Sequence, residues 1–275
     1  MSVLEKTFEN IKAQGRKALI PYIMAGDPDL KVSADLLKSL PEAGADVIEL
    51  GMPFTDPMAD GPVIQNAARR ALANKVGMAD VLDLIREFRK DNTQTPIILM
   101  GYFNPLMAYG VERFCQDASQ AGVNGLLIVD IPPEESAELW PYARKAGLDI
   151  IRMITPTTKD KRLDTVLKET SGFLYYVSIT GITGTASAMP DKIASHIDQI
   201  RGKTNLATVV GFGIKTADDA RAMGAVSDGV VVGSALIKAL EDSGIESVLK
   251  ILRDLKAALD NISDTALPDA DVACR

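Results

Sequence analysis

The chain contains the stretch Ala45-Asp-Val-Ile-Glu-Leu-Gly-Met-Pro-Phe-Thr-Asp-Pro-Met-Ala-Asp-Gly-Pro-Val-Ile64, in which an apolar run leads directly into an acidic loop. Val47–Leu50 is typical of a buried strand, yet it carries a carboxylate, Glu49. The loop beyond it adds Asp56 and Asp60. A buried carboxylate without a basic neighbour in sequence tends to have a raised pKa. The stretch therefore predicts a strand end at which protons are transferred near neutral pH.

Short apolar runs alternate with helical patterns on both sides of this stretch. The predicted strands are Lys17–Ala25, Val47–Leu50, Pro96–Gly101, Leu126–Asp130, Asp149–Ile154, Phe173–Ser178, Leu206–Val210 and Gly229–Val232. Strands that are apolar on both sides indicate a parallel sheet covered by helices on both faces. Eight such units in about 250 residues favour an α/β fold, a closed (β/α)8 TIM barrel, over an open doubly wound sheet.

Two additions to the plain barrel are predicted. An amphipathic helix at Ser2–Gln14 precedes the first strand, and an insertion follows the second strand. That insertion holds the acidic loop and two helical stretches, Val63–Ala73 and Met78–Lys90. We interpret residues 1–260 as one barrel domain and expect the polar tail, residues 261–275, to be frayed.

Composition narrows the class of protein. A net charge of -7 argues against a nucleic-acid or anionic-membrane surface, since such surfaces need clustered Lys and Arg. The two cysteines, Cys115 and Cys274, are far apart, which indicates a reducing compartment. No apolar run approaches the roughly 18 residues of a membrane span, and the N-terminus lacks a signal-peptide pattern. We expect a cytoplasmic protein, and its one histidine and lack of a cysteine cluster argue against a transition-metal site.

The active site of such a barrel lies at the carboxyl ends of its strands. Residues at these ends are Glu49, Asp56, Asp60, Tyr102, Asn104, Asp130, Thr183, Gly184, Thr185, Gly211, Phe212, Gly213, Gly233 and Ser234. A glycine-bearing loop follows each of the last three expected strands, and Ser234 opens a helix. Their backbone N–H groups can point at one phosphate, so a phosphorylated substrate is predicted.

Each of these signals has an ordinary structural alternative. Glu49 is also explained as a core carboxylate satisfied by a neighbouring strand. Asp56 and Asp60 are also explained as turn and cap residues, which for Asp56 alone is the better interpretation. Tyr175, in an apolar strand, is typical of the core. His196 is expected on a solvated helix face, without a role.

The segment Ile48-Glu-Leu-Gly-Met-Pro-Phe-Thr-Asp-Pro-Met-Ala-Asp-Gly61 resembles the signature of the tryptophan synthase α subunits. The resemblance continues through Pro21-Tyr-Ile-Met-Ala-Gly-Asp-Pro28, Gly101-Tyr-Phe-Asn-Pro105, Tyr175-Tyr-Val-Ser-Ile-Thr-Gly-Ile-Thr-Gly184 and Val210-Gly-Phe-Gly-Ile214. It covers nearly the whole chain up to about Leu259. It implies the (β/α)8 fold and a lyase of L-tryptophan biosynthesis that cleaves indole-3-glycerol phosphate to indole and glyceraldehyde 3-phosphate.

The same resemblance implies roles for individual residues. Glu49 would be the general acid/base, and Asp60 would accept a hydrogen bond from the indole N–H and stabilise the positive charge that grows there. The substrate-binding residues would be Tyr22, Ile64, Met100, Leu127, Tyr175 and Thr183. The phosphate-binding residues would be Gly184, Phe212, Gly213, Gly233 and Ser234.

The resemblance also implies a partner. The family pairs this chain with a β subunit that carries pyridoxal phosphate, in an α2β2 tetramer, while this chain itself would hold no cofactor and no metal. Pro53, Asp56 and Asn104 would face that partner. Many members have an arginine-alanine pair where this chain has Ile179-Thr180, so the contacts that close this loop over substrate do not carry over unchanged.

Two other functions stay open on the sequence. One is a phosphosugar isomerase, which would share the phosphate loops but would not need both Glu49 and Asp60. The other is a phosphate-ligand-binding regulatory subunit whose main task is to dock and activate a partner enzyme. Release of indole from indole-glycerol phosphate separates both from the lyase.

Overall fold

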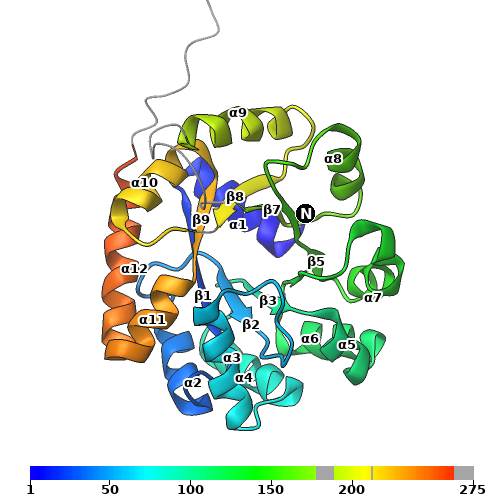
Figure 1. Ribbon diagram of the computed structural model, residues 1–275, viewed down its shortest axis with the longest axis vertical. Coiled ribbons are helices and arrows are strands. Elements are labelled where there is room, and N and C mark those ends of the chain that lie inside the picture. Colours follow the sequence, from blue (N-terminus) through cyan, green and yellow to red (C-terminus); the bar gives the residue numbers. More distant parts are fainter. Residues whose placement is uncertain (178–188, 212, 263–275) are drawn as a thin grey trace, which may run out of the picture.

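The computed structural model describes residues 1–177, 189–211 and 213–262. Within them, nine parallel strands form one sheet in the order β5-β4-β3-β2-β1-β9-β8-β7-β6. The strands are β1 (Ala18–Met24), β2 (Ile48–Gly51), β3 (Ile97–Gly101), β4 (Gly125–Ile128), β5 (Asp149–Ile150), β6 (Arg152–Ile154), β7 (Phe173–Val177), β8 (Ala207–Gly211) and β9 (Gly229–Val232). Figure 1 shows the strands at the centre with the helices around them.

The sheet closes on itself through its fifth strand. The two ends of the strand order, β5 and β6, are separated along the chain only by Ile151. β5 pairs with β4 and β6 pairs with β7, so the chain changes partners at this residue. The nine strands therefore correspond to the eight of a (β/α)8 barrel, which confirms the predicted fold class. The predicted continuous strand Asp149–Ile154 is interrupted where the barrel turns.

The surrounding helices follow the predicted pattern with two differences. They are α1 (Val3–Ala13), α2 (Leu30–Ser39), α3 (Pro62–Ala73), α4 (Met78–Asp91), α5 (Phe103–Tyr109), α6 (Val111–Ala121), the 3-10 helix η1 (Pro133–Glu138), α7 (Trp140–Lys145), α8 (Asp160–Leu167), α9 (Met189–Arg201), α10 (Ala217–Val226), α11 (Ser234–Ser243) and α12 (Ile245–Asp260). The helix expected up to Ala121 breaks at Gly110, whose φ of 93° is a conformation that favours glycine. The helix expected up to Lys145 begins as η1, because the ring of Pro141 prevents one continuous α-helix there.

Helix α1 covers the amino-terminal end of the barrel. A capping box between Ser2 and Glu5 starts it, and its apolar face buries Leu4, Phe8 and Ile11. The Phe8 ring lies 5.3 Å from that of Phe173, at the start of β7. The chain thus closes the barrel end that lies opposite the loops following the strands.

His196 is buried, and its predicted position on a solvated helix face is wrong. Only 9% of it is exposed, because α9 packs this side against a second apolar cluster that includes Tyr176 and Ile197. Its Nδ1 lies 3.1 Å from the Tyr176 hydroxyl oxygen, and its Nε2 lies 3.1 Å from the Thr158 carbonyl oxygen. Both ring nitrogens therefore make polar contacts that join α9 to β7 and to the loop before α8.

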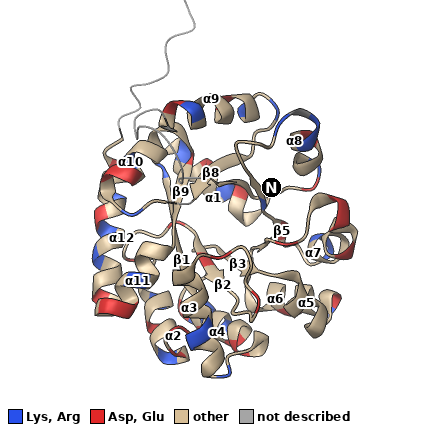
Figure 2. Ribbon diagram, in the orientation of Figure 1, with Lys and Arg blue, Asp and Glu red and all other residues tan. Residues whose placement is uncertain are grey.

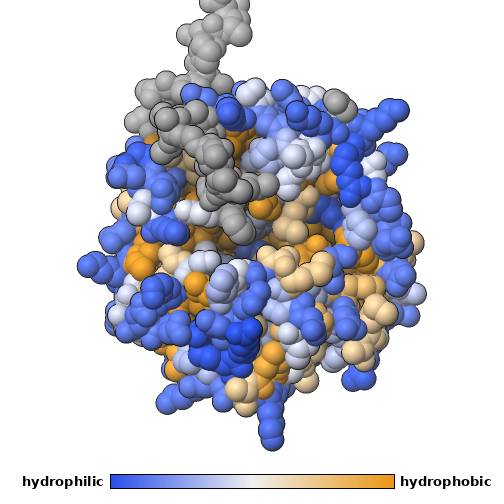
Figure 3. Space-filling view, in the orientation of Figure 1, coloured by the Kyte–Doolittle hydropathy of each residue, from blue (hydrophilic) through white to orange (hydrophobic). Residues whose placement is uncertain are grey.

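Basic and acidic residues alternate along the described outer helices. Figure 2 shows basic and acidic residues intermixed along the outer helices. Figure 3 shows hydrophilic side chains around the edge of the same view and apolar ones nearer its centre. In the part of the chain that the structure describes, no helix has both the length and the apolar character needed to cross a membrane.

A buried ion pair joins the loop after β1 to α3. Asp27 is 1% exposed, and its two oxygens accept hydrogen bonds from Nε of Arg70 at 2.6 Å and Nη2 at 2.9 Å. The remaining Arg70 nitrogen, Nη1, donates to Glu241 of α11 at 2.8 Å. The Asn74 side chain of the next turn donates to the carbonyl of Pro28 at 2.6 Å. Helix α3 is therefore held on the barrel by its charges as well as by its apolar face.

Arg70→Met is expected to lower the free energy of unfolding by about 3 kcal/mol, because it leaves the Asp27 carboxylate buried without its cation. Denaturant unfolding followed by circular dichroism measures the change. Arg86→Met is the control: Arg86 pairs with Asp83 on the surface of α4, and its loss should cost at most about 0.5 kcal/mol. Equal unfolding midpoints for the two variants would show that the Asp27–Arg70 pair contributes no more to stability than the surface pair.

Candidate active site

Glu49 lies in the middle of the barrel wall and faces its interior. It sits in β2, opposite Tyr22 of β1 and Ile98 of β3 in the strand register. The carboxyl group is 1% exposed, and its Oε1 has no hydrogen-bond partner among the described residues. An orphan acceptor of this kind costs stability unless the group is protonated or meets a ligand.

The pKa of Glu49 is raised to about 8. Burial is the main cause, because removal from water disfavours the charged form, and the nearby charge of Asp60 adds to it. At neutral pH the Glu49 carboxyl group is thus predominantly protonated. It can donate a proton and take one back within the range of ordinary assays.

Two tyrosines enclose Glu49. The hydroxyl of Tyr22 occupies the space beside Gly51, where an added Cβ would lie 2.2 Å from it. The hydroxyl of Tyr175 in β7 does the same at Gly211 of β8, where a Cβ would lie 2.1 Å away. Burial, and then the nearby acids, raise the pKa of both phenols well above the usual value. Each ring is therefore a neutral apolar wall with one polar atom close to the carboxyl group.

Asp60 lies in the loop between β2 and α3 and is half-buried. Burial raises its pKa, while a hydrogen bond from the hydroxyl of Tyr102 lowers it. The backbone N–H of Ala59 donates to the same hydroxyl oxygen at 3.0 Å. The amide of Gln65 in α3 donates to the Asp60 carbonyl at 2.9 Å. The second acid therefore has hydrogen-bonding partners that Glu49 lacks, so the two carboxyl groups differ in environment.

The structure brings most of the predicted apolar residues to the same end of the barrel. Met100 of β3 is in register with Gly51 of β2 on one side and with Leu127 of β4 on the other. Leu127 is 1% exposed, and Met100 is half-buried. Ile64, also half-buried, follows Asp60 in the first turn of α3. These apolar side chains thus come from the same ends of the strands as the two acids, and apolar surface of this kind suits a flat aromatic ligand.

The predicted phosphate residues lie partly outside the described part of the chain. Gly184 and Phe212 are not among the described residues, and neither is Thr183, which was predicted to bind substrate. Gly233 and Ser234 open α11, whose N-terminal N–H groups can bind an anion. A Cβ at Gly233 would lie 3.3 Å from Cβ of Tyr22, so this helix start is next to the apolar wall.

Gly213 lies beyond β8 with a φ of 82°, a left-handed conformation that glycine adopts without strain. It is exposed. Gly213 therefore presents backbone atoms without a side chain to solvent.

The predicted partner surface lies on the same rim. Asp56 and Asn104 are exposed, and Pro53 is half-exposed. Two large apolar side chains beside them are also in solvent: Met58 is 83% exposed and Met107 is 55% exposed.

Tyr102 was predicted to lie at a strand end, but no role was predicted for it. Its position after β3 put it on the rim, but only its contacts with Ala59 and Asp60 connect it to an acid of the site. Tyr175 is buried, at 7% exposed, as its apolar strand predicts, and burial and then Glu49 raise its pKa. Among the described residues, no group of three or more His, Cys, Asp or Glu side chains is placed to hold a metal ion.

Comparisons with known proteins agree with this geometry. The family model described as tryptophan synthase alpha chain matches residues 8–266. The solved tryptophan synthase subunit alpha from Legionella pneumophila str. Paris is 40% identical, with a TM-score of 0.88 over 95% of this chain and 100% of that chain. A structure from Aquifex aeolicus VF5 is 35% identical, with a TM-score of 0.88 over 94% of this chain and 99% of that chain. Tryptophan synthase from M. tuberculosis, in its aminoacrylate-bound form, is 30% identical, with a TM-score of 0.85 over 94% of this chain and 100% of that chain.

Proposed function

The chain belongs to the tryptophan synthase alpha chain family, and we propose that Glu49 and Asp60 carry out its reaction here. That reaction is the aldol cleavage of indole-3-glycerol phosphate to indole and glyceraldehyde 3-phosphate, a lyase step of tryptophan biosynthesis. The observation that carries the proposal is the buried carboxyl group of Glu49, with a pKa of about 8 and an oxygen that has no protein partner among the described residues.

Glu49 serves two proton transfers. The bond between indole C3 and the side chain breaks only after C3 is protonated, because an indole carbanion is a poor leaving group. The side-chain hydroxyl must lose its proton as the aldehyde forms. A carboxyl group that is protonated at rest donates the first proton and then accepts the second.

Asp60 acts on the other end of the indole ring. Protonation of C3 places positive charge on the ring nitrogen, and a carboxylate that accepts the N–H hydrogen bond stabilises that charge. For this role Asp60 must be ionised while Glu49 is protonated. The hydrogen bond from Tyr102 to Asp60, and its absence at Glu49, support this division.

We expect kcat/KM to fall as pH rises through about 8. The pKa of Glu49 is raised, so its acid form dominates below that pH and is lost above it. A pH–rate profile on the isolated chain measures this limb, with circular dichroism at each pH as a check of folding. A profile that stays flat to about two pH units above the pKa of Glu49 would contradict the assignment of Glu49 as the acid.

The substrate would be held at both ends. We propose that Tyr22, Ile64, Met100, Leu127 and Tyr175 form the indole slot, with Thr183 also at the substrate. Gly184, Phe212, Gly213, Gly233 and Ser234 would bind the phosphate, and the helix start at Ser234 next to the Tyr22 wall supports this. Residues 1–260 would form one catalytic domain and residues 261–275 a tail.

The alpha chain of this family needs no cofactor of its own. We propose that a tryptophan synthase β subunit with pyridoxal phosphate is the partner, in an α2β2 tetramer in the cytoplasm. Pro53, Asp56 and Asn104 would contact it, and the exposed Met58 and Met107 beside them support that surface.

Release of indole from indole-3-glycerol phosphate tests the whole proposal. The purified chain should release indole slowly alone and faster when a tryptophan synthase β subunit is added. A Glu49→Gln variant serves as the inactive control. A folded chain that releases no indole under either condition would show that the substrate is wrong.

A further inference from the structure

Tyr102 makes contacts that a packing residue does not need. It is the N-cap residue of α5 and is 3% exposed. Its ring lies against that of Phe54, with 5.3 Å between the centroids, in the loop that carries the second acid. Its hydroxyl oxygen accepts the Ala59 N–H at 3.0 Å, which leaves the hydroxyl proton for the Asp60 carboxylate.

We propose that Tyr102 is a positioning residue for Asp60: one hydroxyl group holds both the peptide N–H before this acid and its carboxylate, and so fixes where the negative charge lies. The inference rests on the role proposed above for Asp60. A carboxylate in an irregular loop needs such a support, because a displacement of about 1 Å from the ring nitrogen weakens the charge stabilisation.

The hydrogen bond from Tyr102 also helps to keep the pKa of Asp60 below that of Glu49. The titratable groups that face Asp60 are Glu49 from β2, Tyr22 from β1 and Tyr102 from the start of α5, while Asp130 acts on Tyr102. Of these, only the Tyr102 hydrogen bond lowers the pKa of Asp60, whereas burial raises it. Without this donor, less of Asp60 would be ionised in the pH range where Glu49 keeps its proton.

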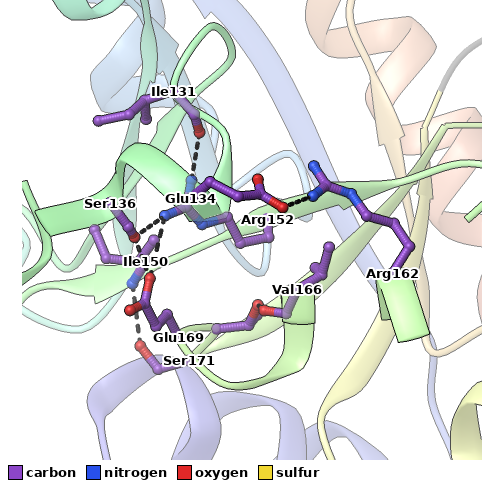
Figure 4. Close-up of polar contacts among 10 residues, drawn as sticks. Ile131, Glu134, Ser136, Ile150, Arg152, Arg162, Val166, Glu169 and Ser171 are labelled. Carbon is purple, nitrogen blue, oxygen red and sulfur yellow. Dashed lines mark hydrogen bonds and ion pairs between the residues drawn. The ribbon is translucent and has the colours of Figure 1, made fainter. Parts of the chain in front are cut away.

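Tyr102 is itself anchored through the loop after β4. The N–H of Phe103, the next residue, donates to Oδ1 of Asp130 at 2.8 Å. The backbone carbonyl of Ile131, the residue after Asp130, accepts a hydrogen bond from Nη1 of Arg152 at 2.5 Å. Figure 4 shows this contact at the top of a polar cluster between β6, η1 and the end of α8.

The centre of the cluster around Arg152 is buried. Arg152 is 5% exposed, and its Nη2 donates to the hydroxyl of Ser136 at 2.7 Å. The Ser136 hydroxyl of η1 donates to Glu169, just beyond the end of α8. An ion pair between Glu134 of η1 and Arg162 of α8 joins the same two segments. The loop that carries Asp130 is therefore tied to the buried side chains of Arg152 and Ser136, and these contacts support the position of Tyr102.

Tyr102→Phe tests the proposal, because it keeps the ring against Phe54 and removes only the hydroxyl. We expect kcat to fall about 10-fold or more, the loss expected for a hydrogen bond to a charged group, with KM changed less than kcat. The acid limb of the pH–rate profile should move to higher pH, since Asp60 then needs a higher pH to ionise. A purely structural role would lower the stability without moving this limb.

Tyr109→Phe is the matched control. The Tyr109 hydroxyl donates to Asp117 at 2.7 Å, a bond of the same kind at the other end of α5 and away from the two acids. This variant should keep kcat, KM and the acid limb of the parent chain. If Tyr102→Phe behaves like it, the positioning role is wrong.

Asp130→Ala provides a second route if Tyr102→Phe folds poorly, because the Asp130 side chain is exposed and its removal leaves the core intact. We expect a smaller loss of kcat, with the acid limb shifted in the same direction, and an unshifted limb would overturn the proposal. The outcome for Asp60→Asn keeps the two hypotheses apart. An inactive Asp60 variant with a fully active Tyr102→Phe removes only the positioning role, whereas a fully active Asp60 variant removes both.

Discussion

Glu49→Gln is expected to lower the turnover of indole-3-glycerol phosphate by about 10³-fold or more, since the amide can neither donate the proton to C3 nor accept the one from the hydroxyl. Glutamine has nearly the same shape, so substrate and partner binding should persist. Stability should not fall, because the native state no longer buries an ionisable group. Single-turnover release of indole, together with a binding measurement on a substrate analogue, separates the two effects.

Glu9→Gln makes the same chemical change on the exposed side of α1, at the closed end of the barrel. It should behave as the parent chain does. A Glu49→Gln chain that releases indole at the parental rate would remove this carboxyl group from the mechanism, and the buried orphan oxygen would then need another explanation.

Asp60→Asn is expected to lower kcat by about 10²- to 10³-fold, the range seen when a single charge-stabilising group is removed from an active site. KM should change less, because the charge on the indole ring develops only in the transition state. The same change should lower the pKa of Glu49, since the Asp60 charge is one cause of its elevation. The base limb of the residual activity should therefore move to lower pH.

Asp254→Asn, on the exposed face of α12, is the control for a lost carboxylate. It should leave both kcat and the base limb unchanged. Near-parental rates for Asp60→Asn would return this residue to the turn-forming role that its loop also explains.

The fold was predictable because its signal is local and repeated. Each short apolar run followed by a helical pattern indicates one β/α unit, and eight units leave few architectures. Glu49 stood out for a related reason, since a carboxylate inside an apolar strand breaks the local pattern. The break of the fifth strand at Ile151 was not predictable, because it depends on how the sheet closes.

Contacts between distant segments explain what the sequence did not reveal. His196 lies on a helix whose pattern looks solvated, and only the packing of α9 against Tyr176 buries it. The role inferred for Tyr102 depends on bonds to Ala59, 43 positions away, and to Asp60. A side chain whose partners lie in another loop leaves no periodic trace, so its function becomes visible only in three dimensions.

The tyrosine hydroxyls that fill the spaces beside Gly51 and Gly211 restrict how this sequence can change over generations. A side chain gained at Gly51 would meet the Tyr22 ring, so that change can be accepted only in a lineage where position 22 has already become smaller. If Gly51 changes first, while Tyr22 is still present, the intermediate protein is inactive or unfolded. The two members of each pair are therefore coupled, and a side chain added at the glycine alone should do more harm than the same change made together with a smaller residue at the tyrosine position.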